Sequence, residues 1–78
     1  MYLTRLAPGA RAAGGADQLH FRQLPNGRIN WTGSVESNGA HVFKSSRIAH
    51  RSMADAEAEA IAWAESYGIS DLQIEADD

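Results

Sequence analysis

The sequence predicts an α+β fold in which one α-helix packs on one face of an antiparallel sheet of three to five strands. Two observations indicate this class. Two connectors that end in glycine, residues 25–27 and 37–39, separate three alternating runs of residues, as in consecutive hairpins. An amphipathic helical pattern then extends from residue 52 to residue 67 and precedes one last alternating run.

The two ends of the chain are each expected to add one strand to the sheet. Residues 2–6 alternate weakly and are expected to form a short strand. Residues 7–17 are rich in glycine and alanine and are expected to form a flexible loop. Residues 71–75 alternate, with Leu72 and Ile74 on one side, and predict a final strand. The pattern leaves open whether the first and last strands pair.

The first hairpin joins residues 19–24 to the run that starts at residue 28. Its connector, Pro25-Asn26-Gly27, has glycine third, as a three-residue loop with a left-handed last residue requires. Counting outward from this loop places Phe21 opposite Trp31 and Leu19 opposite Gly33.

The second hairpin is expected to use the same kind of loop at residues 37–39. That register places Phe43 opposite Gly33 and Val35 opposite His41. A two-residue Asn-Gly turn would instead direct Lys44 toward the core, so the three-residue loop is preferred. Together the two hairpins give one expected core face, made of Leu19, Phe21, Ile29, Trp31, Gly33, Val35 and Phe43.

The helix is expected to begin after Ser52, a good N-cap residue that has the acid Asp55 three positions later. Gly68 follows the last periodic residue and is a typical stop. The apolar stripe, at spacings of three and four, holds Met53, Ala56, Ala60, Trp63 and Tyr67, with Ala64 beside it and Ile61 at its edge. Its alanines should let the helix approach the sheet closely.

Composition narrows the function classes. The 78 residues can form a single domain with a thin core, because a domain of this size buries only about 60% of its unfolded surface. The absence of cysteine favours a reducing compartment. No apolar run is long enough for a signal peptide or a membrane span. We therefore expect a cytoplasmic protein, and we expect it to be a monomer or a weak homodimer.

No motif in the sequence indicates catalysis, a metal or a cofactor. The three histidines, His20, His41 and His50, have no metal-ligand spacing among themselves or with a carboxylate. The serines match no nucleophile pattern. The glycines of residues 9–15 lack the lysine and hydroxyl residue of a phosphate-binding loop. A non-enzymatic binding protein is expected.

Charge is divided sharply along the chain. Residues 1–51 hold all seven basic residues and two acids, whereas residues 52–78 hold eight acids and no Lys or Arg. An acidic field of this kind can steer docking onto a basic partner. The expected partner-binding residues are Asp55, Glu57, Glu59, Glu65, Asp71 and Glu75. The alternative is a solvated helix face that only keeps the protein soluble.

The basic half of the chain supports an alternative function. The outward sheet face would carry polar and basic residues able to contact phosphates, in particular Arg22, Arg28 and Lys44, with Arg47 following. Against nucleic-acid binding, the aromatic residues that could stack on bases are expected to point inward, and the isoelectric point is near 5.5. Direct nucleic-acid binding is therefore the second choice.

Two resemblances to known families complement these patterns. The segment from Asn38-Gly39 through Val42, Ser45, Ile48 and Arg51 to Ala54-Asp55 is similar to the hairpin-into-helix unit of the YegP-type bacterial family, which has no assigned activity. In size, alanine content, acidic helix and element order, the whole chain resembles small phage-encoded anti-CRISPR proteins. That resemblance implies a stoichiometric inhibitor that binds a Cascade-type RNA-guided complex and blocks target DNA binding through the acidic residues named above. A small bacterial domain with another partner is the remaining alternative.

Overall fold

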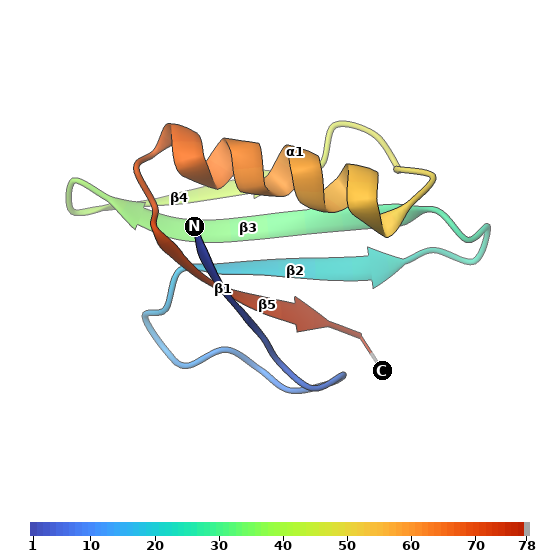
Figure 1. Ribbon diagram of the computed structural model, residues 1–78, viewed down its shortest axis with the longest axis horizontal. Helices are drawn as coiled ribbons and strands as arrows, with labels where there is room; N and C mark the ends of the chain where they lie inside the picture. The colour runs from blue at the N-terminus through green and yellow to red at the C-terminus, as the bar shows by residue number, and fades with distance from the viewer. Residues whose placement is uncertain (78) are drawn as a thin grey trace.

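The computed structural model, which describes residues 1–77, contains one helix and five strands in a single sheet (Figure 1). In chain order the elements are β1 (Tyr2–Arg5), β2 (Gln18–Gln23), β3 (Ile29–Ser37), β4 (Ala40–Ser45), α1 (Met53–Ser66) and β5 (Asp71–Ala76). The sheet order is β1-β5-β2-β3-β4, and α1 lies on one face. The predicted α+β class is confirmed.

The sheet is mixed rather than antiparallel throughout. The strands β2, β3 and β4 form the two expected hairpins, but β5 runs parallel to both β1 and β2. The reason is topological, because a helix that carries the chain back along the sheet delivers the next strand in the parallel sense. The first and last strands do pair, with Leu3 beside Leu72.

The first hairpin has the expected register. Phe21 lies opposite Trp31, and Leu19 lies opposite Gly33. The Leu24 N–H donates to the Arg28 carbonyl over 2.7 Å and closes the three-residue loop.

The second hairpin differs from the prediction by one residue. Ser37 pairs with Ala40, so the loop is the two-residue turn Asn38-Gly39. Both turn residues are left-handed, with φ of 51° and 78°, as a type I′ hairpin turn requires. This turn matches the twist of the flanking strands and needs no bulge.

The changed register sends Phe43 away from the helix and Lys44 toward the helix side, which corrects both expected orientations. Phe43 lies opposite Ser34 and Lys44 lies opposite Gly33. His41 pairs with Glu36 rather than with Val35. Lys44 nevertheless stays exposed, because β4 is the edge strand. The two-residue turn therefore does not bury Lys44, which was the reason for preferring the three-residue loop.

The helix forms as expected, but two members of its predicted apolar stripe, Met53 and Tyr67, at the two ends, are exposed rather than packed on the sheet. The Ser52 hydroxyl accepts the Asp55 N–H over 3.1 Å as the N-cap, and Gly68, with φ of 75°, follows the helix end. The three alanines that face the sheet, Ala56, Ala60 and Ala64, are fully buried. They complete a core formed by Leu19, Phe21, Ile29, Trp31, Val35, Leu72 and Ile74. Within residues 1–77, no helix is long and apolar enough to cross a membrane.

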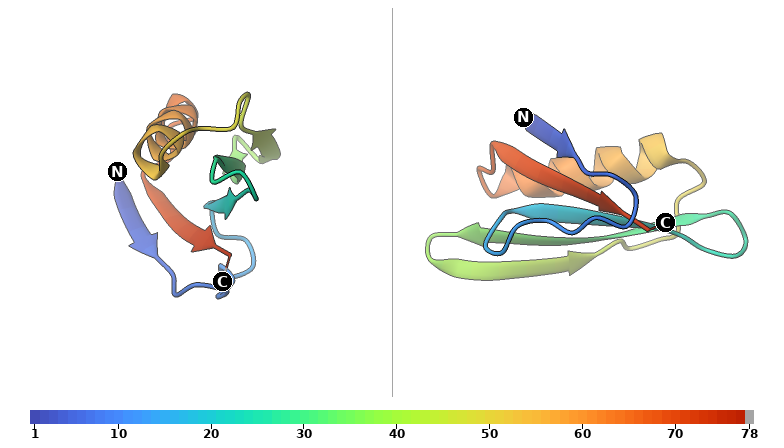
Figure 2. Two further views of the ribbon diagram at one scale, coloured as in Figure 1. Left: turned by 90° about the vertical axis from the view of Figure 1, so that its right-hand side faces the viewer. Right: turned by 90° about the horizontal axis from the view of Figure 1, so that it is seen from below.

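The segment between β1 and β2, residues 6–17, crosses the sheet on the face opposite the helix (Figures 1 and 2). It forms no helix or strand, but hydrogen bonds connect it to β5. The Ala12 N–H donates to the Glu75 carboxylate, the Ala13 N–H to the Gln73 side-chain oxygen, and the Gly9 N–H to the Ala76 carbonyl. The segment thereby covers β5 on that face and leaves β2, β3 and β4 uncovered.

Candidate functional site

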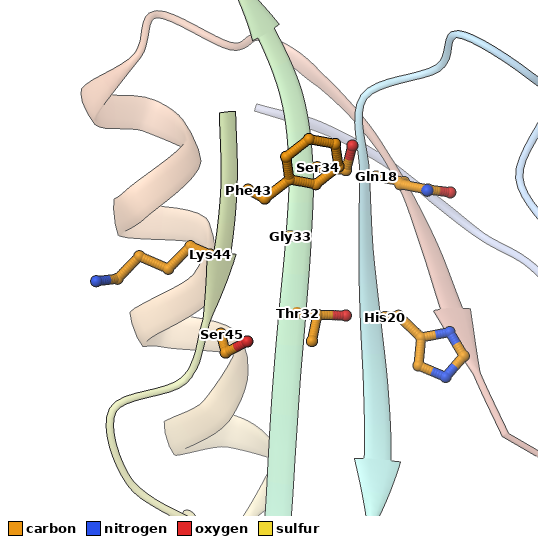
Figure 3. Close-up of a pocket in the computed structure, with 8 residues that line it drawn as sticks. All are labelled: Gln18, His20, Thr32, Gly33, Ser34, Phe43, Lys44 and Ser45. Atoms are coloured by element: carbon orange, nitrogen blue, oxygen red, sulfur yellow. The ribbon is translucent and has the colours of Figure 1, made fainter. Parts of the chain in front are cut away.

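The uncovered side of β2, β3 and β4, called the open face below, is the most distinctive surface of the protein. Strand alternation sends Leu19, Phe21 and Trp31 toward the helix, so their neighbours in sequence point away from it. The open face is therefore made of Gln18, His20, Arg22, Asn30, Thr32, Ser34, Glu36, His41, Phe43 and Ser45. Figure 3 shows six of these side chains, with α1 behind the sheet.

A shallow groove runs along the open face. One depression is lined by Phe43, Ser34 and Thr32, and a second is lined by Arg22, Asn30 and Asp77. The two depressions share His20 and Thr32, so they form one continuous groove from Phe43 to Arg22. Its floor, from Ser34 to Asn30 on β3, is about 13 Å long at a rise of roughly 3.3 Å per residue.

Phe43 is a large apolar side chain on this polar surface. It is 74% exposed, and its ring stacks on the His41 ring with centroids 6.1 Å apart and planes 22° from parallel. Sequence reasoning placed this ring in the core, because the predicted register of the second hairpin was wrong by one residue. The Asn-Gly dipeptide was the signal that could have identified its true orientation.

His20 borders the groove between two carboxylates. Its Nδ1 lies 2.9 Å from Glu75 Oε1 and its Nε2 lies 2.8 Å from Asp77 Oδ1. A protonated imidazole donates from both nitrogens, so in that state it makes both hydrogen bonds at once. Burial would raise the pKa of Glu75, but the hydrogen bonds from Ala12 and His20 and the nearby positive charges outweigh it and lower the pKa.

One end of the groove is basic. Because β2 ends, β3 begins and β4 ends on the same side of the sheet, Arg22, Arg28 and Arg47 meet there, and Arg51 precedes the helix nearby. These four arginines are called the basic end below; in Figure 1, β2 ends and α1 begins at the right. Within residues 1–77, no carboxylate lies within 4.0 Å of the guanidinium groups of Arg28, Arg47 and Arg51. The fourth arginine, Arg22, has its Nε 3.9 Å from Asp77.

Lys44 does not belong to this group. It shares the helix side of β4 with Val42 and points away from Phe43 (Figure 3). The structure therefore brings together three of the four basic residues that the sequence proposed for phosphate contacts, and it separates the fourth.

Half of the six predicted acidic residues are occupied by internal contacts. Arg5 binds the Glu57 carboxylate through its guanidinium, and this hydrogen bond raises the pKa of Arg5. Glu59 Oε1 accepts the Trp31 indole N–H over 2.7 Å and lies 2.9 Å from His50 Nε2. The hydrogen bond from His50 is the main cause that lowers the pKa of Glu59, while burial opposes it. Glu75 is only 5% exposed.

The other three acids of that set are exposed but dispersed. Asp55 lies in the first turn of the helix and Glu65 near its end, about 15 Å apart at 1.5 Å per residue. Asp71 begins β5. Asp77 contacts His20, and Asp78 lies outside the described residues. The helix therefore presents isolated carboxylates rather than a continuous acidic patch.

The part of the chain that the structure describes holds no group of three or more His, Asp or Glu side chains able to share a metal ion. Comparison with models of protein families, with curated proteins and with solved structures finds no match for this chain. The surface chemistry of the open face therefore carries the functional argument.

Proposed function

We propose that the protein is a non-enzymatic module that binds nucleic acid on the open face of its sheet. The observation that carries this proposal is the continuous groove that leads from the exposed ring of Phe43 to the arginines of the basic end. Phosphate contacts from arginine provide affinity, and side chains along the groove contact the sugar and base groups.

The negative net charge of the chain is compatible with this function, because three arginines of the basic end have no carboxylate within 4.0 Å among residues 1–77. At the basic end most carboxylates are engaged: Glu57 by Arg5, Glu59 by Trp31 and His50, and Asp77 by His20. Another acidic group, Asp17, Glu36, Glu65 and Asp71, lies at the opposite end of the sheet, where β2 and β5 begin and β3 and the helix finish. Local potential, rather than net charge, decides where a polyanion binds.

A titration with fluorescein-labelled 20-mers of DNA and RNA tests the proposal. Binding should weaken steeply between 50 and 200 mM salt, as counterion release requires. Arg28→Glu should weaken binding by about tenfold and flatten the salt dependence, and Lys44→Glu is the matched control. Both substitutions change the charge by two, but Lys44 is exposed and lies off the open face, whereas Arg28 is half-buried at the basic end. No binding at 50 mM salt, or an equal effect of the two substitutions, would refute the proposal.

A second candidate function is occupancy of a basic protein surface, including the inhibition of a Cascade-type complex that the family resemblance implied. The acidic end formed by Asp17, Glu36, Glu65 and Asp71 favours it. Pull-down by such a complex should be lost when Glu65 and Asp71 are both changed to Lys, and it should survive Arg28→Glu. Reversal of Glu57 or Glu59 is a poor test, because it also breaks contacts that hold the fold.

A further inference from the structure

We infer that the ligand of the open face is a single-stranded nucleic acid and that one of its bases stacks on Phe43. This inference rests on the proposed function and names the form of the ligand. Three features of the groove support it: the exposed ring, the unpartnered hydroxyl groups beside it and the narrow width of the face.

The ring of Phe43 is placed to receive a flat apolar partner. It is 74% exposed on a strand whose other exposed open-face residues, His41 and Ser45, are polar. His41 stacks against the ring at a centroid distance of 6.1 Å, and the two side chains are called the aromatic platform below. Aromatic platforms of this kind bind bases with little regard to sequence, because every base has a π-face.

The groups next to the platform suit the edge of an unpaired base. Ser34 lies opposite Phe43, and Thr32 is the next outward residue along β3. Among residues 1–77, neither hydroxyl has a hydrogen-bond partner, so each can donate to or accept from a base. Unpaired bases expose their pairing edges to such groups, whereas a duplex keeps those edges engaged.

The shape of the face disfavours a duplex. Three strands at a spacing of about 4.8 Å give an open strip roughly 10 Å wide. The segment 6–17 covers β5 and limits this strip on one side, and β4 forms its other edge. In a duplex each base face is also covered by its stacked neighbours, so no face is available to Phe43. A flexible single strand can follow the groove with a base on the ring and phosphates at Arg22 and Arg28.

The test compares labelled single-stranded 12-mers of DNA and of RNA with the same sequences held in hairpin duplexes. The single strands should bind at least tenfold more tightly than the duplexes. Phe43→Ala should weaken single-strand binding by about fivefold or more and leave the salt dependence unchanged, and Phe43→Trp should restore it. The control is Tyr2→Ala, which removes a ring that is 72% exposed at the other edge of the sheet.

The outcomes separate this inference from the proposed function. If duplexes bind as tightly as single strands, or if Phe43→Ala behaves like Tyr2→Ala, the single-strand inference is refuted. In that case a loss of binding in Arg28→Glu still supports nucleic-acid binding on the open face. If neither DNA nor RNA binds in any form, both statements fail.

Discussion

Gly33 lies directly beneath the indole ring of Trp63, so closely that a Cβ atom built on this glycine would lie 2.2 Å from Trp63 Cζ3. The glycine is in the middle of β3, and the tryptophan projects from the helix above it. Trp63 also packs against Trp31, with ring centroids 5.6 Å apart. The missing side chain therefore makes room for the largest residue of the helix and sets how closely α1 approaches the sheet.

Gly33→Ala should destabilise the protein. The new methyl group overlaps a ring that the surrounding core holds in place, and such overpacking costs about 1–3 kcal/mol. The measurement is the free energy of unfolding in urea, followed by tryptophan fluorescence. Gly14→Ala is the control, because nothing lies within 4 Å of its added Cβ and its backbone is not left-handed. Equal stability of the two variants would show that Trp63 moves aside freely.

Sequence reasoning succeeded where the signals were local. Ser52 caps the helix, Gly68 follows its end, and the loop that ends at Gly27 sets the register of the first hairpin. Each of these features depends on a few neighbouring residues, whose backbone preferences act without help from the rest of the chain.

It failed where a distant part of the fold decided the outcome. The second hairpin was misjudged because a lysine that faces the helix side of β4 was expected to be buried in the core. The helix leaves that edge strand uncovered. Lys44 therefore stays exposed although it points to the helix side, and Phe43 lies on the open face. Glu75 was taken as an exposed acid, because nothing near it in sequence shows that residues 11 and 12 fold over it.

The candidate site was predictable only in part. The arginines of the outward face were identified from the first hairpin, whose register was correct. The aromatic platform was missed, and with it the argument that now favours nucleic-acid binding over docking through the acidic helix. The contacts of Glu57 and Glu59 were also invisible, since their partners lie on β1, on β3 and before the helix.

Glu59 should make the stability of the protein depend on pH. Its pKa is lowered in the fold, chiefly by the hydrogen bond from His50, so the folded state favours the ionised carboxylate. The stabilisation is complete at pH values above the ordinary pKa of 4.5 and is lost as the pH falls through the lowered value. Glu59→Gln should therefore be about 1–2 kcal/mol less stable than the wild type at pH 7, and the difference should shrink in acid.

Urea unfolding at a series of pH values between 3 and 7 measures this effect. Glu65→Gln is the matched control, because Glu65 is an exposed carboxylate near the end of the same helix. A negative charge there opposes the helix dipole, so its removal should be neutral or slightly stabilising. If Glu59→Gln and Glu65→Gln have the same stability profile, Glu59 contributes nothing through its contacts with Trp31 and His50.

Glu75 should hold the segment 6–17 against the sheet. Its carboxylate accepts the Ala12 N–H and lies 3.5 Å from the Arg11 guanidinium, although the Arg11 side chain itself is 75% exposed. Glu75→Gln removes the charge that both groups contact and should make local opening easier. Trypsin should then cleave after Arg11 at least fivefold faster under native conditions, while cleavage after Arg28 stays unchanged.

Mass spectrometry of the fragments over time gives the rate at each arginine separately. Glu36→Gln is the control, because its side chain is exposed and makes no hydrogen bond to residues 6–17 in the described part of the chain. A cleavage rate after Arg11 that is equally fast in the wild type would mean that Glu75 does not restrain the segment. A selective increase in Glu75→Gln would instead show that this one buried carboxylate keeps the segment on β5, and so sets the width of the open face.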